Sequence, residues 1–248
     1  MKSLRIKNLS KIEKVSLIGS KDTLELTLSN LPKLDSLKFN TIPLTVSNIR
    51  QIRLLGKHSL SHLICNDLQL GELIIEDMST LKSINCHGNQ LGELVLNNPN
   101  LLEEINLSNN KFENFELPFI PLLKHLNFND NELFELKLLS CPTIENLRCR
   151  RNNISEIDIR NLSKLKYLDL AYNKLNFFEI NHNALSICRL GNNNLDSIGI
   201  KSAQSLKSLW VDDNIFEELH LPSIPTLELL HCGSNQIINL NCNQLRKV

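Results

Sequence analysis

An array of units about 21 residues long is the feature that most limits how this chain can fold. Counted from their first apolar residue, nine units begin at Leu60, Leu81, Leu102, Leu123, Ile144, Leu165, Leu185, Leu206 and Leu227. One step is 20 residues long and all the others are 21. A unit this short cannot bury an apolar core alone, so successive units must stack and share one. The sequence therefore predicts a single repetitive solenoid.

Each unit places its apolar residues at fixed offsets from the first. In the fifth and sixth units these are Ile144, Leu147, Cys149, Ile154, Ile157 and Ile159, then Leu165, Leu168, Leu170, Leu175, Phe178 and Ile180. Offsets 3 and 5 alternate with polar neighbours, which indicates a strand with one buried face. The second half of the unit repeats this theme, so the return side is expected to be extended too. The remaining connections are too short for a stable helix.

Asparagine recurs at offset 8. The positions are Asn89, Asn110, Asn131, Asn152, Asn173, Asn193, Asn214 and Asn235, with Leu68 in the first unit. The LxxLxLxxN pattern resembles the leucine-rich-repeat family, in its short bacterial-type form with proline near the end of the unit. The resemblance implies a curved solenoid with a parallel β-sheet on the concave face, an extended or irregular return side and little helix. It also implies that the asparagines turn inward and bond backbone groups as a structural ladder.

The two ends of the array depart from the regular pattern. Residues 1–59 are interpreted as degenerate N-terminal repeats that cap the same solenoid, and 60–248 as nine regular repeats in one domain. A slip in register predicts an insertion or bulge around residues 41–48. After the last return strand no capping helix is predicted. Either Leu245 folds over this open strand, or two chains meet there end to end, or the chain is part of a longer protein.

Composition narrows the classes of partner. Lys plus Arg and Asp plus Glu both number 27, so the net charge gives no reason to expect nucleic acid or an anionic membrane. No apolar run reaches the length of a membrane span, and the first residues lack the apolar segment of a signal peptide. We therefore expect a cytoplasmic protein, or one in the host cytoplasm if it is a secreted effector.

The seven cysteines are interpreted as core residues rather than as a disulfide framework or a zinc site. Six occupy positions where other units have leucine, isoleucine or phenylalanine: Cys65, Cys86, Cys149, Cys188, Cys232 and Cys242. Cys141 falls in a loop, and the sequence contains no CxxC pair. Cys65 and Cys86 are expected to stack about one strand apart, which makes them the pair most easily mistaken for a disulfide.

Side chains at offsets 2, 4, 6 and 7 are predicted to form the exposed strand face, and this face changes character at the fifth unit. Earlier units carry mostly Asn, Ser and His. The candidate partner-binding residues in the later units are Arg148, Arg150, Arg151, Tyr167, Asp169, Tyr172, Arg189, Trp210, Asp212, Asp213 and His231. They include the only tryptophan and both tyrosines, and no lysine occupies these offsets. Trp, Tyr and Arg are enriched at the centres of protein interfaces, where Lys is depleted.

A simpler interpretation stays open for this face. Arg148 and Arg189 flank Asp169 in one column, so the three side chains could pair with one another on a solvated sheet. The return side carries an acidic column, which we interpret as a solubilising rim: Glu72, Glu93, Glu135, Glu156 and Glu218.

No catalytic constellation is visible in the sequence. It contains no GxSxG elbow, phosphate-binding P-loop or HExxH motif, and no cysteine stands beside a plausible histidine base. His62 and His125 share a column but lie about 14 Å apart by strand spacing, too far to bind one zinc ion. No catalytic residue, metal or cofactor is therefore predicted.

Three functions remain. The favoured one is a non-enzymatic protein–protein interaction module that uses repeats five to eight, and the family resemblance also fits a bacterial effector acting in a host cell. The second is single-stranded nucleic-acid binding, with Trp210 and Tyr167 as stacking platforms and the arginines along the phosphates. Neutral net charge and the interleaved aspartates count against it. The third is a purely structural scaffold or adaptor.

Overall fold

A computed structural model describes residues 2–18, 24–40, 49–77, 79–138 and 140–241 of the chain. It divides into two compact units, Met1–Glu113 with Pro118–Leu123 and Asn114–Leu117 with Lys124–Val248, called here the N-terminal and C-terminal units. The described residues form strands and turns and include no helix, which confirms the predicted scarcity of helix. The assignment of 60–248 to one domain stays a prediction.

Within the part of the chain that the structure describes, no helix has the length and apolar character needed to cross a membrane.

The N-terminal unit has strands on two sides. Its strand face pairs β6 (His62–Ile64), β8 (Ser83–Asn85) and β10 (Glu104–Asn106) in parallel. Its return side is a parallel sheet of β1 (Lys2–Lys7), β3 (Leu24–Leu31), β5 (Ile49–His58), β7 (Glu72–Ile75) and β9 (Leu94–Leu96). Strands β2 (Lys14–Ile18) and β4 (Ser36–Asn40) pair separately. The insertion expected at residues 41–48 lies outside the described residues.

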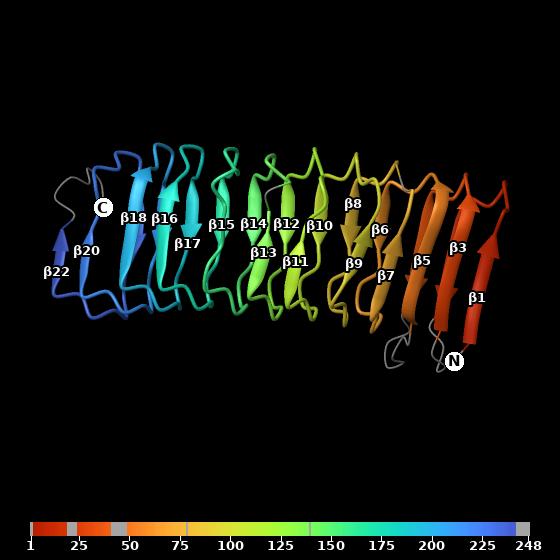
Figure 1. Cartoon of the computed structure of the whole chain (residues 1–248), viewed down its shortest axis with the longest axis horizontal. Helices are drawn as coiled ribbons and strands as arrows, with labels where there is room; N and C mark the ends of the chain where they lie inside the picture. The colour runs from red at the N-terminus through yellow and green to blue at the C-terminus, as the bar shows by residue number, and fades with distance from the viewer. Residues whose placement is uncertain (1, 19–23, 41–48, 78, 139, 242–248) are drawn as a thin grey trace. The chain divides into compact units, whose positions relative to one another are not determined.

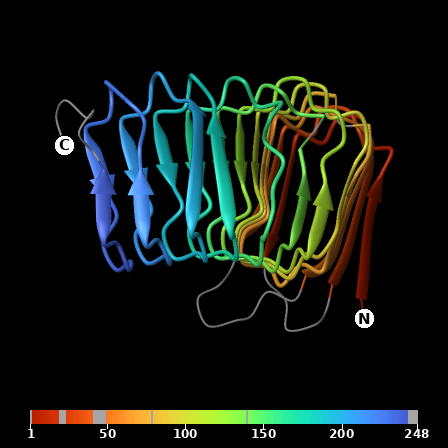
Figure 2. The ribbon, with the colours of Figure 1, turned by 60° about the vertical axis from the view of Figure 1, so that its left-hand side comes forward.

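The C-terminal unit repeats this plan. Its strand face contains six parallel strands, β12 (His125–Asn127), β14 (Asn146–Arg148), β15 (Tyr167–Asp169), β17 (Ile187–Arg189), β19 (Ser208–Trp210) and β21 (Leu229–His231). Its return side holds three strand pairs, β11 (Asn114–Glu116) with β13 (Glu135–Lys137), β16 (Phe177–Asn181) with β18 (Ser197–Ser202), and β20 (Glu218–His220) with β22 (Asn239–Asn241). The arrows of the two sides point in opposite directions (Figures 1 and 2). Each repeat therefore runs out along one side and back along the other.

The core of both units follows the apolar offsets. The middle residue of each strand-face strand points inward, as for Leu147, Leu168 and Cys188, which are fully buried. Residues 155–159 form no strand, although Ile154, Ile157 and Ile159 carry the same pattern as other return segments. The prediction of an extended or irregular return side holds, with the fifth repeat as its irregular member.

The described cysteines are free thiols, and most are core residues as predicted. Cys65, Cys86, Cys149 and Cys188 are fully buried, and so is Cys141 in its loop, while Cys232 is partly exposed. Cys65 and Cys86 lie in hydrogen-bond contact without a disulfide, and burial raises the pKa of the Cys65 thiol well above its usual value. Cys242 lies outside the described residues.

The asparagine ladder has the geometry that the family resemblance implied. Asn152 Oδ1 accepts the Leu133 N–H at 3.0 Å, and its Nδ2 donates to the carbonyls of Phe128 at 2.9 Å and Cys149 at 3.0 Å. The same three bonds recur at Asn89, Asn110, Asn173, Asn193 and Asn214. Each amide thus satisfies backbone groups that leave a strand and cannot reach water.

Candidate functional site

The residue before each ladder position adopts a left-handed backbone conformation. The φ angles lie between 48° and 69° at Asp67, Gly88, Asn109, Asp130, Arg151, Tyr172, Asn192, Asp213 and Ser234. Asn, Asp and Gly tolerate this conformation, whereas a bulky side chain there costs about 1 kcal/mol or more. Arg151 and Tyr172 are therefore the strained exceptions in this column, and both are candidate site residues.

Polar side chains at offset 4 bond the backbone two residues on. Asn106 and Asn127 accept the N–H groups of Ser108 and Asn129 at 3.1 Å and 3.0 Å. Asp169 plays the same part with the Ala171 N–H at 3.1 Å, and only 4% of its surface is exposed. These residues shape the turn that comes after the strand, a role that the sequence pattern did not reveal.

Asp169 also orients the tyrosine beside it. The Tyr167 hydroxyl donates to Asp169 Oδ2 at 3.4 Å. Burial, followed by the negative charge of Asp169, raises the pKa of Tyr167, so the phenol keeps the proton that it donates. Asp169 thus holds Tyr167 in place from below the exposed face.

Five candidate residues form one continuous stack across strands β14, β15, β17, β19 and β21. The guanidinium carbon of Arg148 lies 5.1 Å from the ring centroid of Tyr167, and that of Arg189 lies 5.7 Å from the same ring. Arg189 also lies 4.7 Å from the Trp210 centroid. The rings of Trp210 and His231 then stack with centroids 5.4 Å apart and planes inclined by 8°.

A second, smaller stack forms at the turns beside the first. The guanidinium carbons of Arg150 and Arg151 lie 4.4 Å and 5.2 Å from the ring centroid of Tyr172, which is 40% exposed. Arg151 also pairs with Asp130 at 3.5 Å. The strained tyrosine therefore contacts two arginines that precede it by one repeat.

The simpler interpretation of the sequence requires Arg148 and Arg189 to pair with Asp169. In the structure they do not. Among the described residues, no ion pair joins Asp169 to Arg148 or Arg189, whose guanidinium groups lie against aromatic rings instead. Arg189 Nε is buried without a hydrogen-bond partner. Side-chain stacking, rather than charge pairing, is what arranges these residues.

Asp212 and Asp213 lie beside the stack rather than in it. A Cβ atom on Gly191 would come within 2.8 Å of Asp212 Oδ1, so the glycine makes room for this carboxylate. Asp213 Oδ2 accepts the Asn192 side-chain N–H at 3.2 Å. All eleven candidate residues belong to the C-terminal unit, and contacts join nine of them into the two stacks and their aspartate support.

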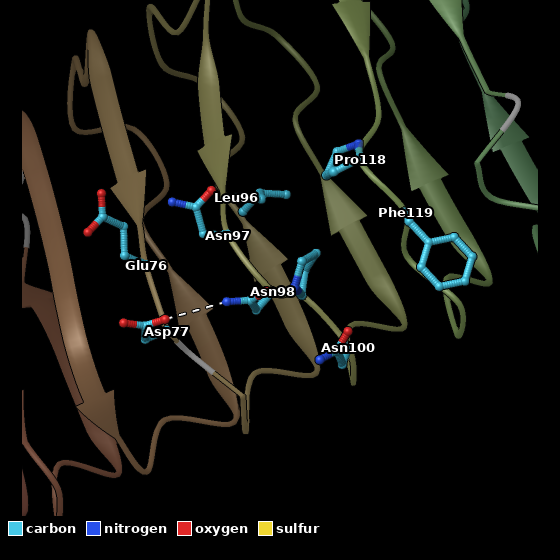
Figure 3. Close-up of a pocket in the computed structure, with 9 residues that line it drawn as sticks. Glu76, Asp77, Leu96, Asn97, Asn98, Asn100, Pro118 and Phe119 are labelled. Carbon is cyan, nitrogen blue, oxygen red and sulfur yellow. Dashed lines mark hydrogen bonds between the residues drawn. The ribbon is translucent and has the colours of Figure 1, made fainter.

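A hollow in the N-terminal unit lies apart from these residues, and the sequence does not predict it. It has a volume of about 550 Å³ and is lined by residues that include Glu76, Asp77, Asn98 and Phe119 (Figure 3). Asn98 Nδ2 donates to Asp77 Oδ1 at 3.5 Å across it. Within the described ranges, no group of three or more His, Cys, Asp or Glu side chains is placed to hold a metal ion.

Solved structures match this architecture along most of the chain. YopM, a leucine-rich effector protein from Yersinia pestis, superposes with a TM-score of 0.67 and 27% identity, over 86% of this chain and 65% of YopM. The functional domain of InlJ from Listeria monocytogenes superposes with a TM-score of 0.55 and 20% identity, over 88% of this chain and 50% of that domain. The repeats, their inward asparagines and these matches agree. The chain has the leucine-rich-repeat fold.

A third solved structure shares the fold at similar coverage. The leucine-rich-repeat domain of APL1 matches with a TM-score of 0.57 and 21% identity, over 90% of this chain and 61% of that domain. This leucine-rich-repeat chain thus spans between one half and two thirds of these three structures. No protein-family model and no curated protein matches its sequence.

Proposed function

We propose that this chain is a non-enzymatic protein-interaction module. It binds a protein partner through the Arg–aromatic surface, defined as Arg148, Arg150, Arg151, Tyr167, Tyr172, Arg189, Trp210 and His231. The continuous stack from Arg148 to His231 is the observation that carries this proposal. Stacking restrains long arginine side chains before a partner arrives, which lowers the entropy lost on binding.

Backbone strain supports the same surface. Tyr172 and Arg151 occupy turns where other repeats have Asn, Asp, Gly or Ser. Strain that persists against local preference clusters at functional sites, because a functional side chain outweighs its small effect on stability. The strained pair adjoins the long stack, so two independent features point to one region.

The nucleic-acid alternative is less compatible with this geometry. A single-stranded base needs a free aromatic face on which to stack. Trp210 has Arg189 on its β17 side and stacks on His231 on its β21 side. Tyr167 has Arg148 and Arg189 on its two sides. Neither ring offers a free face.

The proposal also covers the place where the module acts. YopM is described as an effector protein, and this likeness supports an effector acting in the host cytoplasm as the extension of our proposal. A cytoplasmic location in the producing cell stays the alternative.

The proposal of an end-to-end dimer through strand β22 is tested by analytical ultracentrifugation. Residues 242–248, including Leu245, lie outside the described residues.

Affinity capture from a cell lysate tests the interaction surface. Arg148→Glu combined with Trp210→Ala removes one end of the long stack and the ring between Arg189 and His231, while leaving the buried core intact. The matched control is Arg160→Glu with Phe177→Ala, an exposed arginine and an exposed aromatic on the return side of the same unit.

The expected result is a partner that both wild type and control capture and that the stack variant loses. Circular dichroism melting curves must show that both variants are folded. Retention of every captured partner by the folded stack variant would overturn the proposal and leave the structural scaffold as the better account.

A further inference from the structure

Three of the four arginines of the Arg–aromatic surface form no ion pair among the described residues. Among the described residues, Arg151 pairs with Asp130, but Arg148, Arg150 and Arg189 form no ion pair with any carboxylate. Arg148 is exposed, and Arg150 and Arg189 are partly exposed. By contrast, exposed arginines and lysines on the return side have partners, such as Arg160 with Asp158 and Lys201 with Glu179.

Stacking determines which part of each guanidinium remains available. The guanidinium carbons of Arg148, Arg150 and Arg189 lie over aromatic rings, and a guanidinium stacked on a ring keeps its N–H donors along its edge. An edge of this kind binds a carboxylate with two parallel hydrogen bonds. Arginines stacked in this way are suited to the recognition of carboxylates.

We propose that the partner presents an acidic segment, whose Asp or Glu carboxylates bind the edges of Arg148, Arg150 and Arg189. This inference rests on the proposed function and names the chemistry of its partner. Arg148 and Arg189 lie on strands separated by β15, so the carboxylates they bind are about 10 Å apart by strand spacing. Asp169, between them, is almost fully buried and turned toward Ala171 and Tyr167.

Two aspartates beside the Arg–aromatic surface disfavour a uniformly anionic polymer. Asp212 and Asp213 come two and three residues after Trp210 and place negative charge at repeat eight. A nucleic-acid strand with a charge on every phosphate would meet repulsion there, whereas a protein segment can change sign along its length. An acidic segment followed by a basic residue is complementary both to the arginines and to these aspartates.

The only tryptophan of the chain, Trp210, provides a direct signal for the test. Its emission is recorded while the full chain is titrated with a short glutamate-rich peptide ending in lysines. The same peptide with glutamine for glutamate, and oligothymidylate, are titrated in parallel. We expect saturable binding of the glutamate peptide only, and binding that weakens as salt rises.

Variants assign the binding to the guanidinium edges. Arg189→Gln should lower the affinity for the glutamate peptide about tenfold, which is the loss expected when one charge-assisted bidentate contact is removed. Arg189→Lys should restore only part of it, because an ammonium cannot form the planar pair. Arg160→Gln, on the return side, should bind like wild type.

Equal binding of the glutamate and glutamine peptides, or tighter binding of oligothymidylate, would refute the acidic-segment proposal. Lysate capture separates this failure from failure of the proposed function. If the stack variant loses a captured protein while the glutamate peptide does not bind, the surface is an interface for a partner of different chemistry. If no captured protein depends on the stack, both proposals fall.

Discussion

Two adjacent positions of each repeat share a turn and yet accept very different residues. The ladder position is Asn in every repeat from the second onward, and the position before it varies through Asp, Gly, Asn, Arg, Tyr and Ser. Both are tightly defined in space, one by hydrogen bonds such as those of Asn152 and the other by a φ near 55°. The difference is that one side chain faces the core and the other faces solvent.

The ladder position requires a side chain with particular hydrogen-bonding groups, whereas the position before it requires only a particular backbone conformation. A buried amide must match specific donors and acceptors, so only one residue type fits. An exposed residue with a left-handed backbone must only tolerate that conformation, and the energetic cost for a bulky side chain is small. Tyr172 and Arg151 are the positions where a bulky residue stands despite the left-handed backbone.

The largest effect is expected at the ladder. Asn152→Ala leaves the Leu133 N–H and the carbonyls of Phe128 and Cys149 without their side-chain partner in the core. We expect the free energy of unfolding to fall by about 3 kcal/mol, measured by urea denaturation. The control is Asn153→Ala, whose side chain makes one long, exposed bond to Glu132 at 3.4 Å. Similar losses in both variants would show that the buried ladder amide stabilises the fold no more than an exposed one does.

An intermediate effect is expected from tyrosine at an ordinary turn. Asn192 has the same left-handed conformation as Tyr172, with φ of 57° against 58°, but it suits that backbone. Asn192→Tyr should lower the free energy of unfolding by about 1 kcal/mol, because tyrosine adopts this conformation at a cost. Thermal unfolding monitored by circular dichroism measures it. A variant as stable as wild type would show that these turns place no demand on the residue.

The smallest effect is expected from the reverse change. Tyr172→Asn relieves strain but loses the stacking of Arg150 and Arg151, each worth about 0.5 kcal/mol at an exposed ring, so stability should hardly change. In a background of Arg150→Ala and Arg151→Ala, Tyr172→Asn should instead stabilise the protein. Urea titration of all four proteins gives the coupling energy. Additive changes would show that the stack contributes nothing.

Much of the fold could be predicted because the core positions repeat. The strand-face strands, the inward asparagines and the buried cysteines all result from apolar periodicity and from the amide chemistry of one recurring position. The missing strand at residues 155–159 could not be predicted, since Ile154, Ile157 and Ile159 repeat the pattern of paired segments. Burial determines that pattern, whereas pairing depends on how neighbouring backbones approach.

The candidate site was predictable in position but not in arrangement. Column membership is set by repeat offsets, so Arg148, Tyr167, Arg189 and Trp210 could be assigned to one face. Whether an arginine pairs with Asp169 or lies on a ring depends on rotamers, which no offset encodes. The recurring Asn, Asp and Gly before the ladder are a sequence signal for the left-handed turns, because these residues tolerate that backbone conformation.

The one short repeat shows where this architecture tolerates change. Tyr167 and Ile187 are 20 residues apart and still pair in register on the strand face, while the return strands shift register between Ile180 and Asn181. The missing residue is therefore absorbed entirely on the back of the solenoid. For protein engineering, insertions, tags and cleavage sites therefore belong on the return side. Residues of the strand face can be substituted one column at a time, because a change of length on the return side leaves their register unaltered.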